Sequence, residues 1–195
     1  MESQFVFLDK EELSLPAMLD RLQIPSRQGV VMMPFFPREF TRVHFSRQSY
    51  MTDDLLRDTN IQIKVRNIWD TYRAMGRRAA PVGGDTLQKM MMQVRMATDK
   101  IKARGGKILF VRTPSSGPSL MGEQKGFPRE KYWDPLLNIT GSQGIHFLDY
   151  PATNHFICPE WSHLSVQDAK VYTAELARIM QTEKGWTFPA STNKE

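Results

Sequence analysis

The chain has 195 residues, 41% of them hydrophobic, which is enough apolar material to bury a core within one ordinary domain. Its formal net charge is +5, but the basic residues are dispersed along the sequence, which argues against nucleic acid as a partner. A single cysteine excludes an intrachain disulfide and any four-cysteine metal site. We therefore expect a single domain spanning residues 1–195.

Neither a membrane span nor an export signal is evident in the sequence. Residues 1–13 lack a positively charged start followed by an apolar run, and the chain contains no stretch of eighteen consecutive apolar residues. We expect no membrane segment. The sequence indicates neither a compartment nor an oligomeric state.

The N-terminal half, residues 1–84, is the harder half to interpret. Residues 4–8 and 29–33 are short apolar runs that could form strands, and residues 53–77 carry apolar side chains at helical spacing. Between them, residues 34–40 (PFFPREF) are aromatic and punctuated by proline. Clustered aromatics can mark a lid or a contact surface, but we expect this stretch to pack in the core or against a loop.

The C-terminal half, residues 85–182, shows a regular order of helices and strands. Asp85 is expected to cap a helix that runs to Arg104, and residues 107–112 form a short apolar strand that ends in a loop over 113–118. The helix should bury Leu87, Met90, Met91, Val94, Thr98 and Ile101. The remaining expected elements are a helix over 129–138, a strand over 144–150, and a helix capped by Ser165 with Asp168 three residues on and Val166, Ala169, Tyr172, Leu176 and Ile179 on one face.

This alternation of helices and strands predicts parallel strands joined by right-handed crossovers. The expected fold class is therefore α/β, as a three-layer sandwich around a mostly parallel sheet. The sheet could be incomplete at the N-terminus, and residues 183–195 are expected to be a tail.

Reactive side chains gather in the two loops that follow the expected strands. Because ligands bind beyond the carboxyl ends of parallel strands, these loops should converge if the strands are neighbours. Arg112 at the end of the first strand and Asn154 in the second loop are the candidate substrate-binding residues. The first loop also holds Ser115 and Ser116, and the second holds Asp149, His155, Cys158, Glu160, Ser162 and His163.

Glu160 and His163 form the more specific pattern. A carboxylate three residues before a histidine can accept a hydrogen bond from one imidazole nitrogen while the other nitrogen faces a substrate or nucleophile. The helix that starts shortly afterwards makes the local field positive, which favours a neutral, basic imidazole. Asp149 is the second candidate for the acid. The alternative is that His163 merely caps or packs against the helix and that Glu160 is an acid beside a helix N-terminus.

A metal site is a competing interpretation, because His155, Cys158, Glu160 and His163 fall within nine residues and all can bind zinc. Their spacing matches no common zinc signature, and the order of proline and cysteine in zinc deaminases is reversed here. We therefore expect no metal.

Residues 156–165, FICPEWSHLS, with Asp168 and Tyr172 following, resemble the last motif of the SGNH (GDSL-like) hydrolases. They are most similar to members related to the acetyltransferases that modify bacterial exopolysaccharides, and the resemblance covers about residues 85–182. It implies a sandwich of the SGNH or flavodoxin-like kind, and ester hydrolysis or O-acyl transfer on a small acyl ester or acetylated glycan, without a metal or organic cofactor. His163 would be the general base, Glu160 would stand where the family usually has aspartate, and an extracytoplasmic location in a bacterium would fit.

The nucleophile of such a site is not evident, since no Gly-Asp-Ser motif follows an early strand and no Gly-x-Asn-Asp block is present. Three explanations are open. The nucleophile could lie upstream in a longer protein, the chain could be a non-catalytic relative that binds a glycan or a protein, or Ser115 or Ser116 could serve. These two serines beside Pro114 are also ordinary turn residues.

Overall fold

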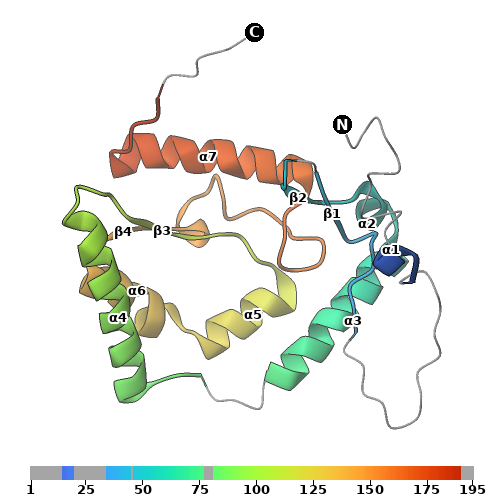
Figure 1. The fold of residues 1–195 in the computed structure, drawn as a ribbon, viewed down its shortest axis with the longest axis horizontal. Helices are drawn as coiled ribbons and strands as arrows, with labels where there is room; N and C mark the ends of the chain where they lie inside the picture. The colour runs from blue at the N-terminus through green and yellow to red at the C-terminus, as the bar shows by residue number, and fades with distance from the viewer. Residues whose placement is uncertain (1–14, 20–33, 45, 77–80, 190–195) are drawn as a thin grey trace.

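A computed structural model of the chain describes residues 15–19, 34–44, 46–76 and 81–189 (Figure 1). The strands expected over residues 4–8 and 29–33 lie outside these ranges. The described elements are, in order, α1 (Leu15–Leu19), β1 (Thr41–Val43), β2 (Ser49–Met51), α2 (Asp53–Arg57), α3 (Thr59–Gly76), α4 (Gly84–Lys102), β3 (Leu109–Arg112), α5 (Gly117–Gly126), α6 (Arg129–Thr140), β4 (Gln143–His146), the 3-10 helix η2 (Phe147–Asp149) and α7 (Val166–Lys184).

The fold is mixed α/β. Strands β3 and β4 are parallel neighbours, with Leu109 opposite Gln143 and Arg112 opposite His146, which confirms the expected parallel pairing. Strands β1 and β2 form a separate antiparallel pair. Because the described strands make two sheets of two strands each, the three-layer sandwich around a larger sheet is not confirmed.

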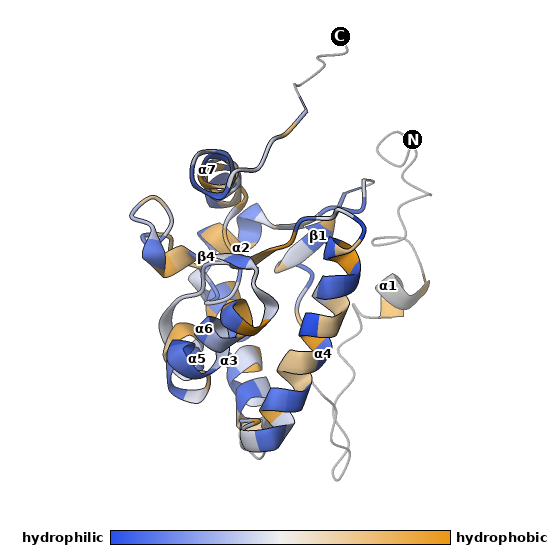
Figure 2. Ribbon diagram, turned by 90° about the vertical axis from the view of Figure 1, so that its left-hand side faces the viewer, coloured by the Kyte–Doolittle hydropathy of each residue, from blue (hydrophilic) through white to orange (hydrophobic). Residues whose placement is uncertain are grey.

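The helix that opens the C-terminal half differs in detail from its prediction. Its N-cap is Gly83, and Asp85 lies in the first turn, where a carboxylate is favoured by the helix dipole. The buried face is also narrower than expected. Met91 and Thr98 are buried, because α4 packs against α6, but the side chains expected beside them are exposed: Met90, Val94 and Ile101. Figure 2 shows the mixed hydropathy along α4.

Two further boundaries depart from the sequence-based expectation. The loop expected over residues 113–118 is cut short by α5, which starts at Gly117 and has a proline in its first turn, a position that proline tolerates well. The second strand ends at His146, because its Nδ1 accepts a hydrogen bond from the Leu148 N–H and the chain turns into η2. The helices expected over residues 129–138 and from Ser165 are confirmed, and the Ser165 hydroxyl accepts from the Asp168 N–H.

The helix expected over residues 53–77 is divided into α2 and α3. Asp58 adopts an extended conformation between them, and its carboxylate accepts a hydrogen bond from the Asn60 N–H at 2.8 Å. The Thr52 hydroxyl caps α2 by accepting from the Leu55 N–H. Leu55 is fully buried, so this short helix is fixed at both its cap and its core face.

Among the described residues, the core has two clusters that include aromatic side chains. In the N-terminal half, Phe40 is buried with Phe36 packed beside it, which confirms core packing for these two aromatics of residues 34–40. Phe35 instead is 76% exposed. The other cluster joins the C-terminal elements through Phe147, Phe156 and Tyr172.

In Figure 1, α7 lies above strands β3 and β4, while α5 and α6 lie below them. Figure 2 shows the same order for α7, β4, α6 and α5. Gly144 of β4 allows α6 to approach closely, because a Cβ there would lie 2.7 Å from a Leu137 methyl and 2.8 Å from the Trp133 ring. Among the described residues, none of the helices is long and apolar enough to cross a membrane.

Candidate functional site

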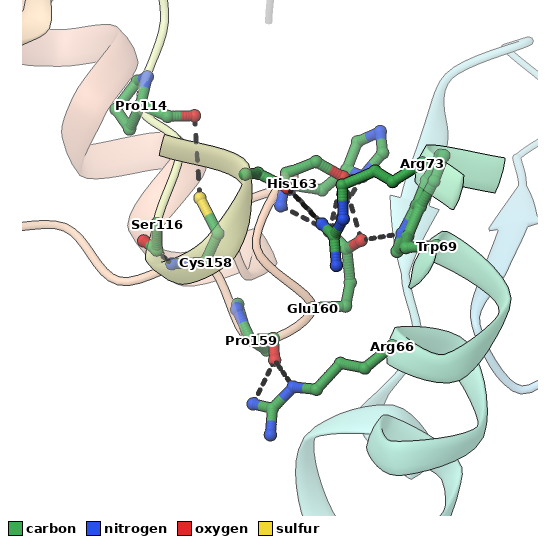
Figure 3. Close-up of polar contacts among 11 residues, drawn as sticks. Arg66, Trp69, Arg73, Pro114, Ser116, Cys158, Pro159, Glu160 and His163 are labelled. Atoms are coloured by element: carbon green, nitrogen blue, oxygen red, sulfur yellow. Dashed lines mark hydrogen bonds and ion pairs between the residues drawn. The ribbon is translucent and has the colours of Figure 1, made fainter. Parts of the chain in front are cut away.

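The loop between η2 and α7 carries a fully buried carboxylate, that of Glu160 (Figure 3). Its Oε2 accepts hydrogen bonds from the indole N–H of Trp69 and from the hydroxyl of Ser162, the latter at 2.9 Å. Its Oε1 accepts from the His163 N–H at 2.6 Å and from the Ser162 N–H at 3.2 Å. Buried charge is costly unless hydrogen-bonded, and this carboxylate is surrounded by donors.

The imidazole of His163 completes this set. Its Nδ1 lies 2.9 Å from a Glu160 carboxylate oxygen, so the hydrogen bond expected from the three-residue spacing is present. The acid is 0% exposed whereas the imidazole is 55% exposed. Within the described part of the chain, the hydrogen bonds of this ring all involve Nδ1. An imidazole whose Nδ1 is engaged in this way can present Nε2 to another molecule.

The two groups shift each other's pKa. The hydrogen bond to Glu160 raises the pKa of His163, and this outweighs the opposing effect of burial. Burial by itself would raise the pKa of Glu160, but hydrogen bonds from His163, Ser162 and Trp69 lower it. The helix-dipole argument, which favoured the neutral imidazole, was therefore wrong about the direction, because the adjacent carboxylate has the larger effect.

Helix α3 holds this loop through three side chains that the sequence analysis did not single out. Trp69 binds Glu160, and Arg66 Nε donates to the Pro159 carbonyl at 3.0 Å (Figure 3). The Arg73 guanidinium lies 4.5 Å from the centroid of the Trp161 ring. Residues 66, 69 and 73 follow helical spacing, so one face of α3 contacts the loop. That spacing was the available signal, although nothing in it indicates which distant segment the face would meet.

Trp161 adopts a left-handed backbone conformation with φ of +81°. This is rare for a bulky residue and persists only where the surroundings enforce it. The Trp161 carbonyl accepts from the Ser116 N–H at 2.9 Å, and its ring lies against Gly117, where a Cβ would come within 2.9 Å of the indole. The turn that aims Glu160 and His163 is thus fixed by the start of α5.

Ser115 and Ser116 occupy structural positions. Ser115 is buried, and its hydroxyl lies 3.0 Å from an Arg112 nitrogen. Ser116 accepts from the Cys158 N–H at 2.8 Å. The two loops therefore converge as expected. The hydrogen bonds of the His163 imidazole, however, run to Glu160 and Ser162, so the structure gives neither serine a nucleophile's contact with that ring.

The other candidate residues are also placed. Arg112 pairs with the Glu123 carboxylate and, by burial, has a lowered pKa. Asp149 pairs with Arg129 and not with His163, so the second candidate acid serves elsewhere. Asn154 is exposed, and its N–H donates to the Tyr150 carbonyl.

The residues considered as ligands of a zinc site contact other groups. His155 Nδ1 lies 3.1 Å from the Pro151 carbonyl, and the Cys158 thiol contacts the Pro114 carbonyl. Among the described residues, no group of three or more histidine, cysteine, aspartate or glutamate side chains is arranged to hold a metal ion.

His163 lies in the wall of a groove with a volume of about 980 Å³. The groove runs between the N-terminal aromatic cluster, formed by Phe36, Phe40 and Trp69, the β1–β2 hairpin and α7. The Phe40 ring lies edge-on to the imidazole at 5.6 Å, and the Trp69 ring is stacked with it at 6.4 Å. The imidazole is thus held between an acid on one side and an apolar groove on the other.

Comparison with known proteins found no protein family model, no curated protein and no solved structure that matches this chain.

Proposed function

We propose that this chain carries the acid and base of an acyl-transfer site, in an SGNH-like ester hydrolase or O-acyltransferase. The observation that carries the proposal is the 2.9 Å contact between the buried Glu160 carboxylate and His163 Nδ1. A buried acid that orients an accessible imidazole is the arrangement that general-base catalysis requires. The resemblance of residues 156–165 to the last SGNH motif supports the same class of enzyme. The three-layer fold typical of that class is part of the proposal.

The chemistry would proceed through His163 Nε2. This nitrogen takes the proton of an attacking hydroxyl as the hydroxyl oxygen bonds to the ester carbonyl carbon. When the carbon–oxygen bond to the leaving group breaks, the imidazolium returns that proton to the departing alkoxide. Glu160 stays ionised and holds the imidazolium in place. The attacking hydroxyl is that of a serine, or of the acceptor or water.

Ester hydrolysis of a short-chain acyl ester and of an acetylated glycan tests this function. We expect wild-type turnover to fall by about a hundredfold or more in His163→Ala, the range typical of losing a general base. His155→Ala is the matched control, because His155 is an exposed histidine of the same loop that does not contact Glu160. Equal turnover in wild type and His163→Ala would overturn the proposal.

A non-catalytic binding module for a glycan or a protein is the second candidate, and one observation favours it. Ser115 and Ser116 are engaged with Arg112 and with the loop backbone, so neither is poised opposite His163. A saturable glycan complex without turnover, which Trp69→Ala weakens, would support this candidate over the first.

A further inference from the structure

We propose that the groove beside His163 is an acyl-chain site, so that the substrate is an ester of a medium or long apolar acyl chain and not of acetate alone. This inference deepens the proposed function and rests on it, because only the proposed function makes the bound ester a substrate.

The walls of the groove are mostly apolar on both sides. On one side lie aromatic and apolar side chains of the N-terminal half, and on the other lie small residues of α7, which leave room along the helix. Side chains of this kind suit a flexible hydrocarbon that needs area and not hydrogen bonds. The first side is formed by Phe36, Phe40, Tyr50, Met51 and Trp69, and the second by Ala169, Thr173, Ala174 and Ala177.

Among the described residues, the ionisable side chains that line the groove are those of His163, Lys170, Tyr50 and Tyr172, and none is an aspartate or a glutamate. His163 can therefore bind a carbonyl or carboxylate, while most of the remaining lining is apolar. A ligand with one polar group and a long apolar chain matches a lining of this kind.

The size of the groove points the same way. At about 980 Å³ it is at the upper end of the range for drug-sized ligands, roughly 300–1,000 Å³. An acetyl group would leave most of the groove unfilled. A longer chain would add apolar contact with each methylene.

Calorimetry of the binding of dodecanoate, octanoate and acetate to the full chain tests the inference, and it does not require that the protein turn over an ester. We expect saturable binding of dodecanoate, with affinity rising by up to about fourfold per added methylene and no detectable binding of acetate. Ala174→Trp should weaken dodecanoate binding at least tenfold. Val171→Trp is the matched control, because Val171 lies on α7 but does not line the groove. Thr173→Trp provides a second block if Ala174→Trp loses its helical circular dichroism.

The outcomes separate this inference from the proposed function. Dodecanoate binding that Ala174→Trp and Thr173→Trp abolish supports the acyl site, even if no ester is turned over. Equal affinity for acetate and dodecanoate, or dodecanoate binding unchanged in both folded variants, overturns it. If the acyl site is overturned in either of these ways, turnover of short esters that depends on His163 would still support the proposed function.

Discussion

The indole N–H of Trp69 donates to the carboxylate of Glu160, which links α3 to a loop that lies 91 residues further along the chain. The contact joins the N-terminal aromatic cluster to the candidate site. It also supplies one of the donors that keep a fully buried acid ionised.

Trp69→Phe should destabilise the protein by about 1–3 kcal/mol, because it keeps an aromatic ring but leaves a buried charged acceptor short of one donor. Urea unfolding followed by far-UV circular dichroism measures the change. Trp186→Phe is the control, since Trp186 lies beyond α7 and does not contact Glu160. Equal stability of the two variants would show that the indole hydrogen bond contributes nothing.

Gly117→Ala should destabilise the protein by about 2 kcal/mol. Gly117 has φ of +50°, a conformation that alanine adopts at a cost, and its new methyl would press on the Trp161 ring. Thermal unfolding measures the loss, and Gly122→Ala is the control, because nothing lies within 4 Å of a Cβ there. A Gly117→Ala protein as stable as wild type would contradict the close packing of this turn.

The Cys158 thiol should react slowly with a thiol reagent at pH 8. Burial raises the pKa of Cys158 to about 11, against a smaller opposing effect of the Ser116 contact, and the side chain is 1% exposed. The reactive thiolate is therefore both scarce and covered. Ellman's reagent should modify the guanidinium-unfolded chain at least tenfold faster than the native protein, and equal rates would contradict the burial.

Acid should weaken the protein through Glu160. Its pKa in the folded state is below the ordinary value of 4.5, so its contribution to stability is present above that pH and is lost as the pH falls through the folded value. Urea unfolding between pH 6 and pH 3 should show a steeper decline for wild type than for Glu160→Gln. Parallel curves would exclude a pKa shift at this group.

Much of the secondary structure could be predicted locally. The alternation after residue 84 indicated β3, β4, α4, α6 and α7, because each has a clear apolar period or an end signal. Two predictions were wrong for the same reason, namely the width of the buried face of α4 and the end of β4. The buried face of α4 depends on its packing against α6, and the end of β4 depends on the hydrogen bond that the His146 imidazole accepts.

The candidate site was predictable only in part. The Glu160–His163 contact follows from three-residue spacing within one loop, so the sequence alone indicated it. The contribution of Trp69 comes from a helix 91 residues away, and no local pattern specifies such a pairing. The positions of Ser115 and Ser116 likewise depend on Arg112 and on the loop backbone.

The central claim is that Glu160 orients and charges His163, and nitrogen-15 NMR of the imidazole during a pH titration tests it most directly. We expect His163 in the wild type to titrate above 6.5, its ordinary value, and to keep its proton on Nδ1 once neutral, which leaves Nε2 as the base. In Glu160→Gln its pKa should fall, because the hydrogen bond to the carboxylate is what raises it. A neutral ring protonated on Nε2, or a His163 pKa that Glu160→Gln leaves unaltered, would contradict the account.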